Sequence, residues 1–312
     1  MPLLLLMTAV RAADAELPEY LTLAQALAYV DGNHPGVQLA AQQQPQQQLL
    51  QCQQFELQPN SPRLLPGSCG YWQFIAPLQQ QQLLVMRRFL DVVLADQRAA
   101  RDSEAMATAY IRQDRETNRQ QLGQRSEVDV AALDSIYQQK RRQFLVSQSL
   151  QRVSRSLLAI AMNRPGQLPR EVFPPEAALL AGDKLQDERS LLQGIEQHNP
   201  LMQRLRAAGN SALQTLARHY LQHVALEQLL SISLLKAQQR ENSAERGYRD
   251  LSLDKSRTLY ELEVKADLGD AMVDQTAAKL AQMETDYQLL MSRAVLAALR
   301  GEQLELTNDV PE

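Results

Sequence analysis

Residues 78–122 read LQQQQLLVMRRFLDVVLADQRAARDSEAMATAYIRQDRETNRQQL, a run of 45 residues without glycine or proline. Gln, Arg, Leu and Ala dominate this run, and all four are strong helix formers. A helix of this length is far longer than an ordinary globular helix and is typical of a coiled-coil arm. Gly123 follows at once, and glycine favours the left-handed conformation that ends many helices. The stretch therefore predicts one long helical arm with a defined end.

A second long helix is predicted to return along this arm. Ser126 is a good N-cap residue and Asp129 falls in the first turn, where a carboxylate stabilises the helix dipole. The helix runs to about Asn163, before a proline and a glycine. Apolar residues within it alternate steps of four and three, a seam that should face a partner helix. These residues are Val146, Leu150, Val153, Leu157 and Ile160. Residues 78–163 thus predict one antiparallel helical hairpin.

The same plan recurs about 165 residues later. Residues 27–35 match residues 192–200, and each stretch is a short helix stopped at an X-Pro pair. A helical stretch follows from 201 to about 245, then a polar break at 242–254, a further helix from near 253 to a second tip near 267–270, and a final helix at 271–300. The final helix keeps the three-four alternation through its length. We therefore expect an all-α fold of two pseudo-repeated long antiparallel helical hairpins, with little or no β structure.

The expected organisation has five parts. Residues 1–15 read as a signal peptide, with an apolar core and an A-x-A site at 13–15, although the basic start of such a signal is missing and the true start codon stays open. The first helical repeat spans 20–165, a proline-containing linker 166–185, the second and shorter repeat 186–301, and a loose tail 302–312. No other apolar run is long enough for a membrane helix.

The remaining chemistry is sparse. Cys52 and Cys69 could form a disulfide in an oxidising compartment, and two free thiols are an equal alternative. His219, His223 and Glu227 lie at helical spacing and are weak metal-ligand candidates, against the simpler reading of a polar helix face. No phosphate loop or nucleophile–base pattern occurs, so we expect no enzyme and no cofactor. With a net charge of -4 and interleaved signs, nucleic-acid binding is not expected.

Four motifs in order resemble the TolC-like outer-membrane efflux family, also called outer membrane factors. Residues 21–27, LTLAQAL, with Asn-His-Pro at 33–35, resemble the family's opening helix and its Asn-Pro stop. LGQRSEVDV at 122–130 and YELEVKADLGDAM at 260–272 are similar to the two hairpin tips. LLAIAMN at 157–163 is similar to the closing helix, with Asn163 where the family has a Leu-Gly pair.

The resemblance implies a homotrimer whose three protomers form a twelve-helix periplasmic tunnel that works with a periplasmic adaptor and an inner-membrane pump. It implies that acidic residues near the tips line or gate the entrance. Asp129 matches that position, and Asp134, Asp267 and Asp270 are further candidates, with Gly269 in the second hairpin turn. The alternative for all four acids is stabilisation of a helix N-terminus, worth about 0.3–1 kcal/mol each.

The chain departs from the family in the segments between its helices. Family members insert membrane strands of about 9–11 alternating residues between the helices. The available gap at 57–76 is rich in proline, and the gap at 240–250 is charged. We therefore expect a family member that lacks the β-barrel strands and is confined to the periplasm, with association with the outer membrane as the alternative location. The competing hypothesis is a periplasmic coiled-coil scaffold, or a degenerate paralogue without transport activity.

Overall fold

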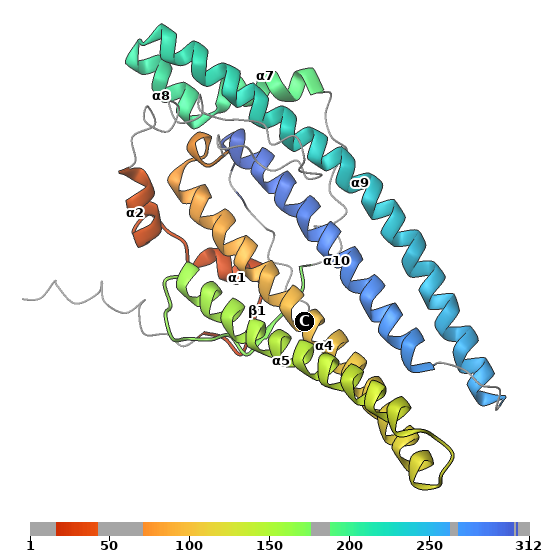
Figure 1. The fold of residues 1–312 in the computed structure, drawn as a ribbon. Helices are drawn as coiled ribbons and strands as arrows, with labels where there is room; N and C mark the ends of the chain where they lie inside the picture. Colours follow the sequence, from red (N-terminus) through yellow and green to blue (C-terminus); the bar gives the residue numbers. More distant parts are fainter. Residues whose placement is uncertain (1–16, 43–70, 176–187, 263–267, 303, 305–312) are drawn as a thin grey trace, which may run out of the picture.

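The computed structural model describes residues 17–42, 71–175, 188–262, 268–302 and 304. Two long helical hairpins dominate it (Figure 1), which confirms the expected all-α fold. The signal peptide at 1–15, both cysteines, Asp267 and most of the tail lie outside the described residues. The elements, in order, are β1 (Tyr20–Leu21), α1 (Leu23–Ala28), α2 (Pro35–Ala41), the short 3₁₀ helix η1 (Tyr71–Phe74), α4 (Pro77–Gln121), α5 (Glu127–Ala161), β2 (Glu171–Val172), α7 (Glu188–His198), α8 (Pro200–Ala208), α9 (Ser211–Glu261) and α10 (Leu268–Leu299).

The four long helices lie side by side in one layer, in the order α5, α4, α10, α9 (Figure 1). Helix α4 packs against α5 within its own hairpin and against α10 of the other hairpin. Helix α9 packs against α10 and has no extensive contact with α4 or α5. The layer is therefore open, with α5 along one edge and α9 along the other.

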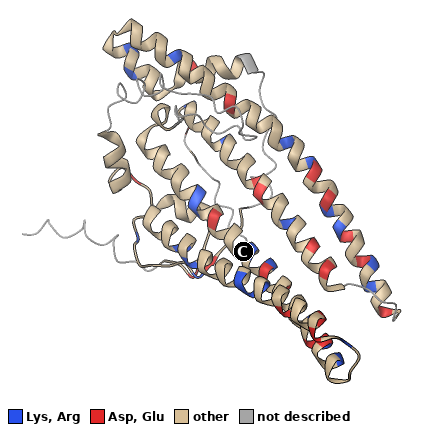
Figure 2. Ribbon diagram, viewed as in Figure 1, with Lys and Arg blue, Asp and Glu red and all other residues tan. Residues whose placement is uncertain are grey.

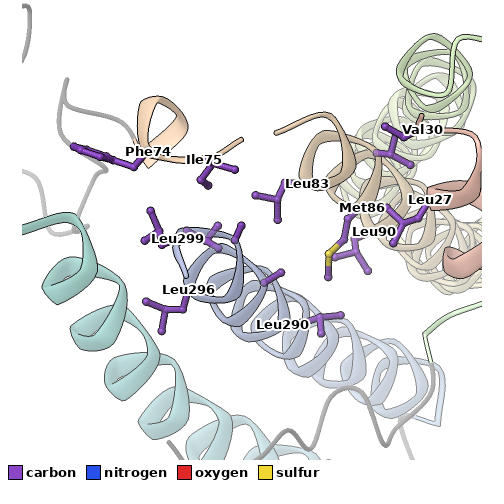
Figure 3. Close-up of a cluster of buried hydrophobic side chains, with 14 of the residues drawn as sticks. Leu27, Val30, Phe74, Ile75, Leu83, Met86, Leu90, Leu290, Leu296 and Leu299 are labelled. Carbon is purple, nitrogen blue, oxygen red and sulfur yellow. The ribbon is translucent and has the colours of Figure 1, made fainter. Parts of the chain in front are cut away.

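The hydrophobic core lies at the end of the hairpins where the short elements gather. Figure 3 shows side chains from α4 and α10 facing each other there, with η1 and the α1 region beside them. The labelled members are Leu27, Val30, Phe74, Ile75, Leu83, Met86, Leu90, Leu290, Leu296 and Leu299. The strands β1 and β2 add one short parallel pair, which joins the start of the chain to the segment after α5. This end of the molecule therefore anchors both hairpins.

A single buried amide joins three segments in this core. The side chain of Asn199 is fully buried, and its Nδ2 donates to the carbonyl oxygens of Phe74 and Leu299, both at 2.8 Å. Its Oδ1 accepts from the backbone N–H groups of Leu201 and Met202, at 3.0 and 3.2 Å. Asn199 thus caps α8 and holds the end of α10 to the segment that leads into α4. All hydrogen-bonding groups of the amide are used, which burial requires.

The first half of the chain repeats this arrangement with a histidine. His34 is the N-cap of α2 and precedes Pro35, as Asn199 precedes Pro200 in α8. Its Nδ1 accepts from the Gly36 N–H at 3.1 Å, which requires an unprotonated Nδ1. The long returning helices also end alike, since Asn163 after α5 and Gly301 after α10 both adopt left-handed φ, 57° and 75°.

The predicted polar break at 242–254 is wrong, because α9 runs unbroken from Ser211 to Glu261. Charged side chains in this stretch form i,i+4 pairs, such as Arg249 with Glu245 at 2.7 Å, and such pairs stabilise a helix. Arg249 also reaches Asp274 of α10 at 2.7 Å. Gly247 costs the helix only about 1 kcal/mol. No helix in the described part of the chain combines the length and apolar character that a membrane crossing requires.

Acid should destabilise the fold through His34. Burial lowers the pKa of its imidazole from the ordinary value of 6.5, although the Ala161 carbonyl and the Asp31 carboxylate act in the opposite direction. The folded state therefore favours neutral His34, while the unfolded chain still binds the proton. This contribution to stability is complete above pH 6.5 and is lost as the pH falls through the folded-state pKa.

We predict that His34→Asn, which copies Asn199, will be less acid-sensitive than the unsubstituted protein. Between about pH 7.5 and about pH 5, the difference in free energy of unfolding between the two should shift in favour of the variant as the pH falls. Urea unfolding across this range measures it. His219→Asn, at an exposed histidine on α9, is the control for the substitution itself and should shift this difference less than His34→Asn does. If the free energy of unfolding of His34→Asn and of the unsubstituted protein changed with pH in the same way, His34 would not be the source of the acid sensitivity.

Candidate functional site

The first hairpin tip is built by local signals on both sides of the turn. After α4, Gly123 adopts a φ of 72°, and the N–H groups of Gly123 and Gln124 bond to the carbonyls of Gln120 and Arg119 at 2.8 and 2.9 Å. This is the Schellman arrangement, which satisfies the last carbonyls of a helix. Ser126 then caps α5, its Oγ accepting from the Asp129 N–H at 3.2 Å. The turn between the two helices is therefore short and fully specified.

Acidic side chains are exposed at this tip. Asp129 lies in the first turn of α5 beside Glu127, where the N-terminal dipole favours negative charge. Asp134 is also exposed, and its Oδ1 accepts from the Gln138 amide at 3.4 Å. Figure 2 shows charges of both signs along the hairpins, with acidic residues near the α4–α5 tip. Asp129 can stabilise the N-terminus of α5 and also contact a solute or a partner protein, because its side chain is exposed.

The second hairpin ends against the side of α4. Gly269 is the second residue of α10, and a Cβ there would come within 2.7 Å of the Thr108 Cγ2. Next to it, Asp270 pairs with Arg112 at 2.6 Å. Since Arg112 precedes Gly123 by 11 positions in α4, the described start of α10 lies about 16 Å short of Gly123 along α4, at about 1.5 Å per residue. The structure therefore does not bring Asp129 and Asp270 together.

The predicted α5 seam does not face any helix in the described part of the chain. Its five residues are 36–58% exposed, while the α5 positions buried toward α4 include Ser147, Ser154 and Leu158. We call this uncovered set the α5 seam: Val146, Leu150, Val153, Leu157 and Ile160. The prediction of an intrachain partner is thus wrong, because the small and polar side chains, rather than the heptad, fit the close contact with α4. In α10 the same alternation is covered, since α10 lies between α4 and α9.

The opposite edge of the layer is also partly apolar. On α9, Leu226, Leu230 and Leu234 follow each other at four-residue spacing and are 39–60% exposed. Four-residue spacing places them on one face of the helix. Both outer helices of the four-helix layer therefore carry apolar stripes that the described residues leave largely exposed, a feature that sequence periodicity alone could not reveal.

The contact between the hairpins is mostly polar along the arms. Arg98 of α4 pairs with Glu284 of α10 at 2.6 Å, and Thr276 donates to Glu104 at 2.7 Å. These pairs are half-exposed, so each contributes little to stability. They do fix the register of α10 on α4 through charge and hydrogen bonding.

The metal-ligand candidates on α9 do not form a cluster. His223 Nε2 lies 3.3 Å from Glu227 Oε1, and His219 is exposed one turn earlier. Within the described ranges, no group of three or more His, Cys, Asp or Glu side chains could hold a metal ion. His219, His223 and Glu227 therefore form part of one polar face of α9.

Comparisons with solved structures show which proteins share this architecture. One structure of CusC, a protein described as forming a transmembrane channel, matches with a TM-score of 0.56 at 11% identity over 89% of this chain and 97% of that chain. The outer membrane protein VceC from Vibrio cholerae matches with a TM-score of 0.52 at 10% identity over 91% and 97%. For a membrane protein from Pseudomonas aeruginosa the TM-score is 0.48 at 11% identity over 72% of this chain, which spans 66% of that protein.

At these identities the likeness concerns the fold. No family model matches the sequence, and no curated protein matches it significantly. The fold evidence therefore comes from the arrangement of helices, while residue roles have to be argued from the chain itself.

The close contact between Gly269 of α10 and Thr108 of α4 leaves no room for an added methyl group. We predict that Gly269→Ala will lower the free energy of unfolding by about 1–2 kcal/mol, because the new Cβ meets the stiff, β-branched Thr108. The combination with Thr108→Ala should remove this cost relative to Thr108→Ala alone. Chemical denaturation of the four proteins measures the coupling.

Gly247→Ala is the matched control, since nothing lies within 4 Å of a Cβ at that position of α9. It should stabilise the protein by up to about 1 kcal/mol through helix propensity. Equal stabilisation by both glycine substitutions would contradict the close packing of Gly269 in α10 against Thr108 in α4.

Proposed function

We propose that this chain, which has the helical fold of TolC-like outer-membrane channels, is the tunnel-forming component of an efflux or secretion assembly. Copies of the chain would associate into a homotrimeric periplasmic conduit that works with a periplasmic adaptor and an inner-membrane pump. The observation that carries this proposal is the open four-helix layer whose two outer helices, α5 and α9, carry exposed apolar stripes.

The edges argue for association with further copies. An isolated apolar side chain on a surface is ordinary, but an ordered stripe along a helix marks an interaction surface. The α5 seam repeats every three or four residues over Val146 to Ile160, which is the pattern of a helix that packs against another helix. The α5 edge and the α9 edge differ, so the contact between copies would be head-to-tail, and such contacts generate rings when the rotation closes.

Ring closure also accounts for the layer's shape. Three copies of a four-helix layer form a twelve-helix wall, the number that the family resemblance implies. Every long helix in such a wall has a neighbour on both sides, so α5 and α9 gain the cover that α4 and α10 already have. The interior of the wall would be the conduit.

The projecting first tips would form the entrance. In a trimer, three copies of Asp129 and Asp134 would lie near the end of the conduit, where like charges repel and cations or protonation could modulate their spacing. Asp270 is tied to Arg112 on the side of α4, so it would contribute to the wall below the tip. This arrangement supports a periplasmic location and a transport role, with no catalytic step.

Oligomeric state tests the proposal. Size-exclusion chromatography with light scattering on the full chain should give a trimer at micromolar concentration. The double variant Val153→Glu/Leu157→Glu places two charges in the α5 seam and should give a monomer, since each buried unpaired carboxylate costs several kcal/mol. Helical content by circular dichroism should stay unchanged, because both positions are exposed in the single chain.

Gln148→Glu is the control on the same helix. Gln148 is exposed and, at about 100° per residue, lies on the side of α5 away from the α5 seam, so this variant should remain trimeric. A monomer or dimer for the unsubstituted chain would favour the alternative of a coiled-coil scaffold. Equal dissociation by Gln148→Glu would show that the seam is not the contact.

A further inference from the structure

One face of the four-helix layer is hollowed where α4 lies between α5 and α10. Three helices line a groove of about 490 Å³, with Arg101 and Asp102 from α4, Lys140 and Arg142 from α5, and Val273 from α10. We call this the basic groove. A smaller groove of about 260 Å³ adjoins it toward the tip and shares three of its residues, Ala105, Lys140 and Val273. The two together are a continuous furrow along α4.

The basic groove carries uncompensated positive charge. Lys140 and Arg142 form no ion pair or hydrogen bond with any described residue. Arg101 pairs with the buried carboxylate of Asp102 at 2.6 Å, and that carboxylate also accepts from the Ser147 hydroxyl. The acid of the groove is therefore fully engaged, while two cations remain available.

The neighbouring acids are engaged as well. In the adjoining furrow, Asp270 pairs with Arg112 and Asp274 pairs with Arg249 of α9, at 2.6 and 2.7 Å. Neither carboxylate is available to neutralise Lys140. A ligand in the basic groove would therefore meet a net positive surface, in a concave site where charges act more strongly than on a convex surface.

Apolar side chains lie between these charges. Ala105, Val146 and Val273 line the basic groove, and Leu133 and Ile136 extend the apolar lining into the adjoining furrow. The groove's volume falls within the range of about 300–1,000 Å³ that is typical of small-molecule sites. An apolar lining beside fixed cations suits a ligand with a hydrocarbon body and an anionic head.

We propose that the basic groove binds amphiphilic organic anions, such as a medium-length carboxylate or sulfonate, with the head group at Lys140 and Arg142 and the hydrocarbon body against Ala105 and Val273. Binding to the chain does not need the ring. That such anions are the transported solutes rests on the proposed conduit, in which the hollowed face of each layer faces inward. Val146 belongs to both the α5 seam and the groove, so a neighbouring copy against the seam would lie beside the α5 wall of the groove.

Two probes of equal chain length and opposite charge test the proposal. Isothermal titration of the full chain with octanoate and with octyltrimethylammonium should show octanoate binding at least about tenfold more tightly. Lys140→Gln/Arg142→Gln should weaken octanoate binding about tenfold or more, since both cations of the head-group site are removed. Val273→Glu should weaken it similarly by placing an acid on the lining.

Arg141→Gln/Arg152→Gln is the control, because it removes the same charge from exposed positions of α5 outside the basic groove. It should change octanoate affinity less than about twofold. Equal affinity for the two probes, equal loss in the control, or no octanoate binding would each overturn the site. Octanoate binding by a chain that proves monomeric would retain the site and overturn only the conduit.

Discussion

Helix α4 packs on two long neighbours at once, and the architecture depends on this double contact. It holds α5 through small and polar side chains such as Ser147 and Ser154. It holds α10 through the apolar core at the anchored end, which includes Leu90 and Leu290, while charged pairs such as Arg98 with Glu284 follow along the arm. Because α9 reaches only α10, the long helices form an open layer rather than a closed four-helix bundle. An open layer necessarily has two edges, and both edges here carry apolar stripes. The proposed ring and the hollowed groove both follow from this geometry.

The anchored end of the layer sets how the hairpins lie beside each other. Asn199 satisfies two carbonyls and two N–H groups from different segments, so the end of α10 and the approach to α4 cannot shift independently without leaving a buried polar group unpaired. From that fixed start, α10 has 32 residues and α4 has 45, so the described N-terminus of α10 lies beside Thr108 and Arg112, below the first tip. This offset is a consequence of the shorter α10 on one common anchor.

The first hairpin turn of the candidate site could be predicted from short-range sequence signals. Gly123 and Ser126 specify the first turn because a left-handed residue and an N-cap act within a few positions. The pairing of Asp270 with Arg112 could not be predicted, since it joins residues from different hairpins. The break predicted at 242–254 was wrong because the charged residues of this stretch form ion pairs along α9 and with α10, which stabilise the helix. Such partners become visible only when the two helices are placed together.

The amino-acid sequence determined the helices, their capped ends, the duplicated plan and the presence of an apolar seam on α5. These features depend on interactions within a few residues, or on a periodicity that one helix displays by itself. The tertiary structure decided which side of each helix is covered. The same three-four alternation is enclosed on α10 and exposed on α5, because α10 has neighbours on two sides and α5 has one. The order of helices in the layer sets that difference, through contacts between residues far apart in the chain.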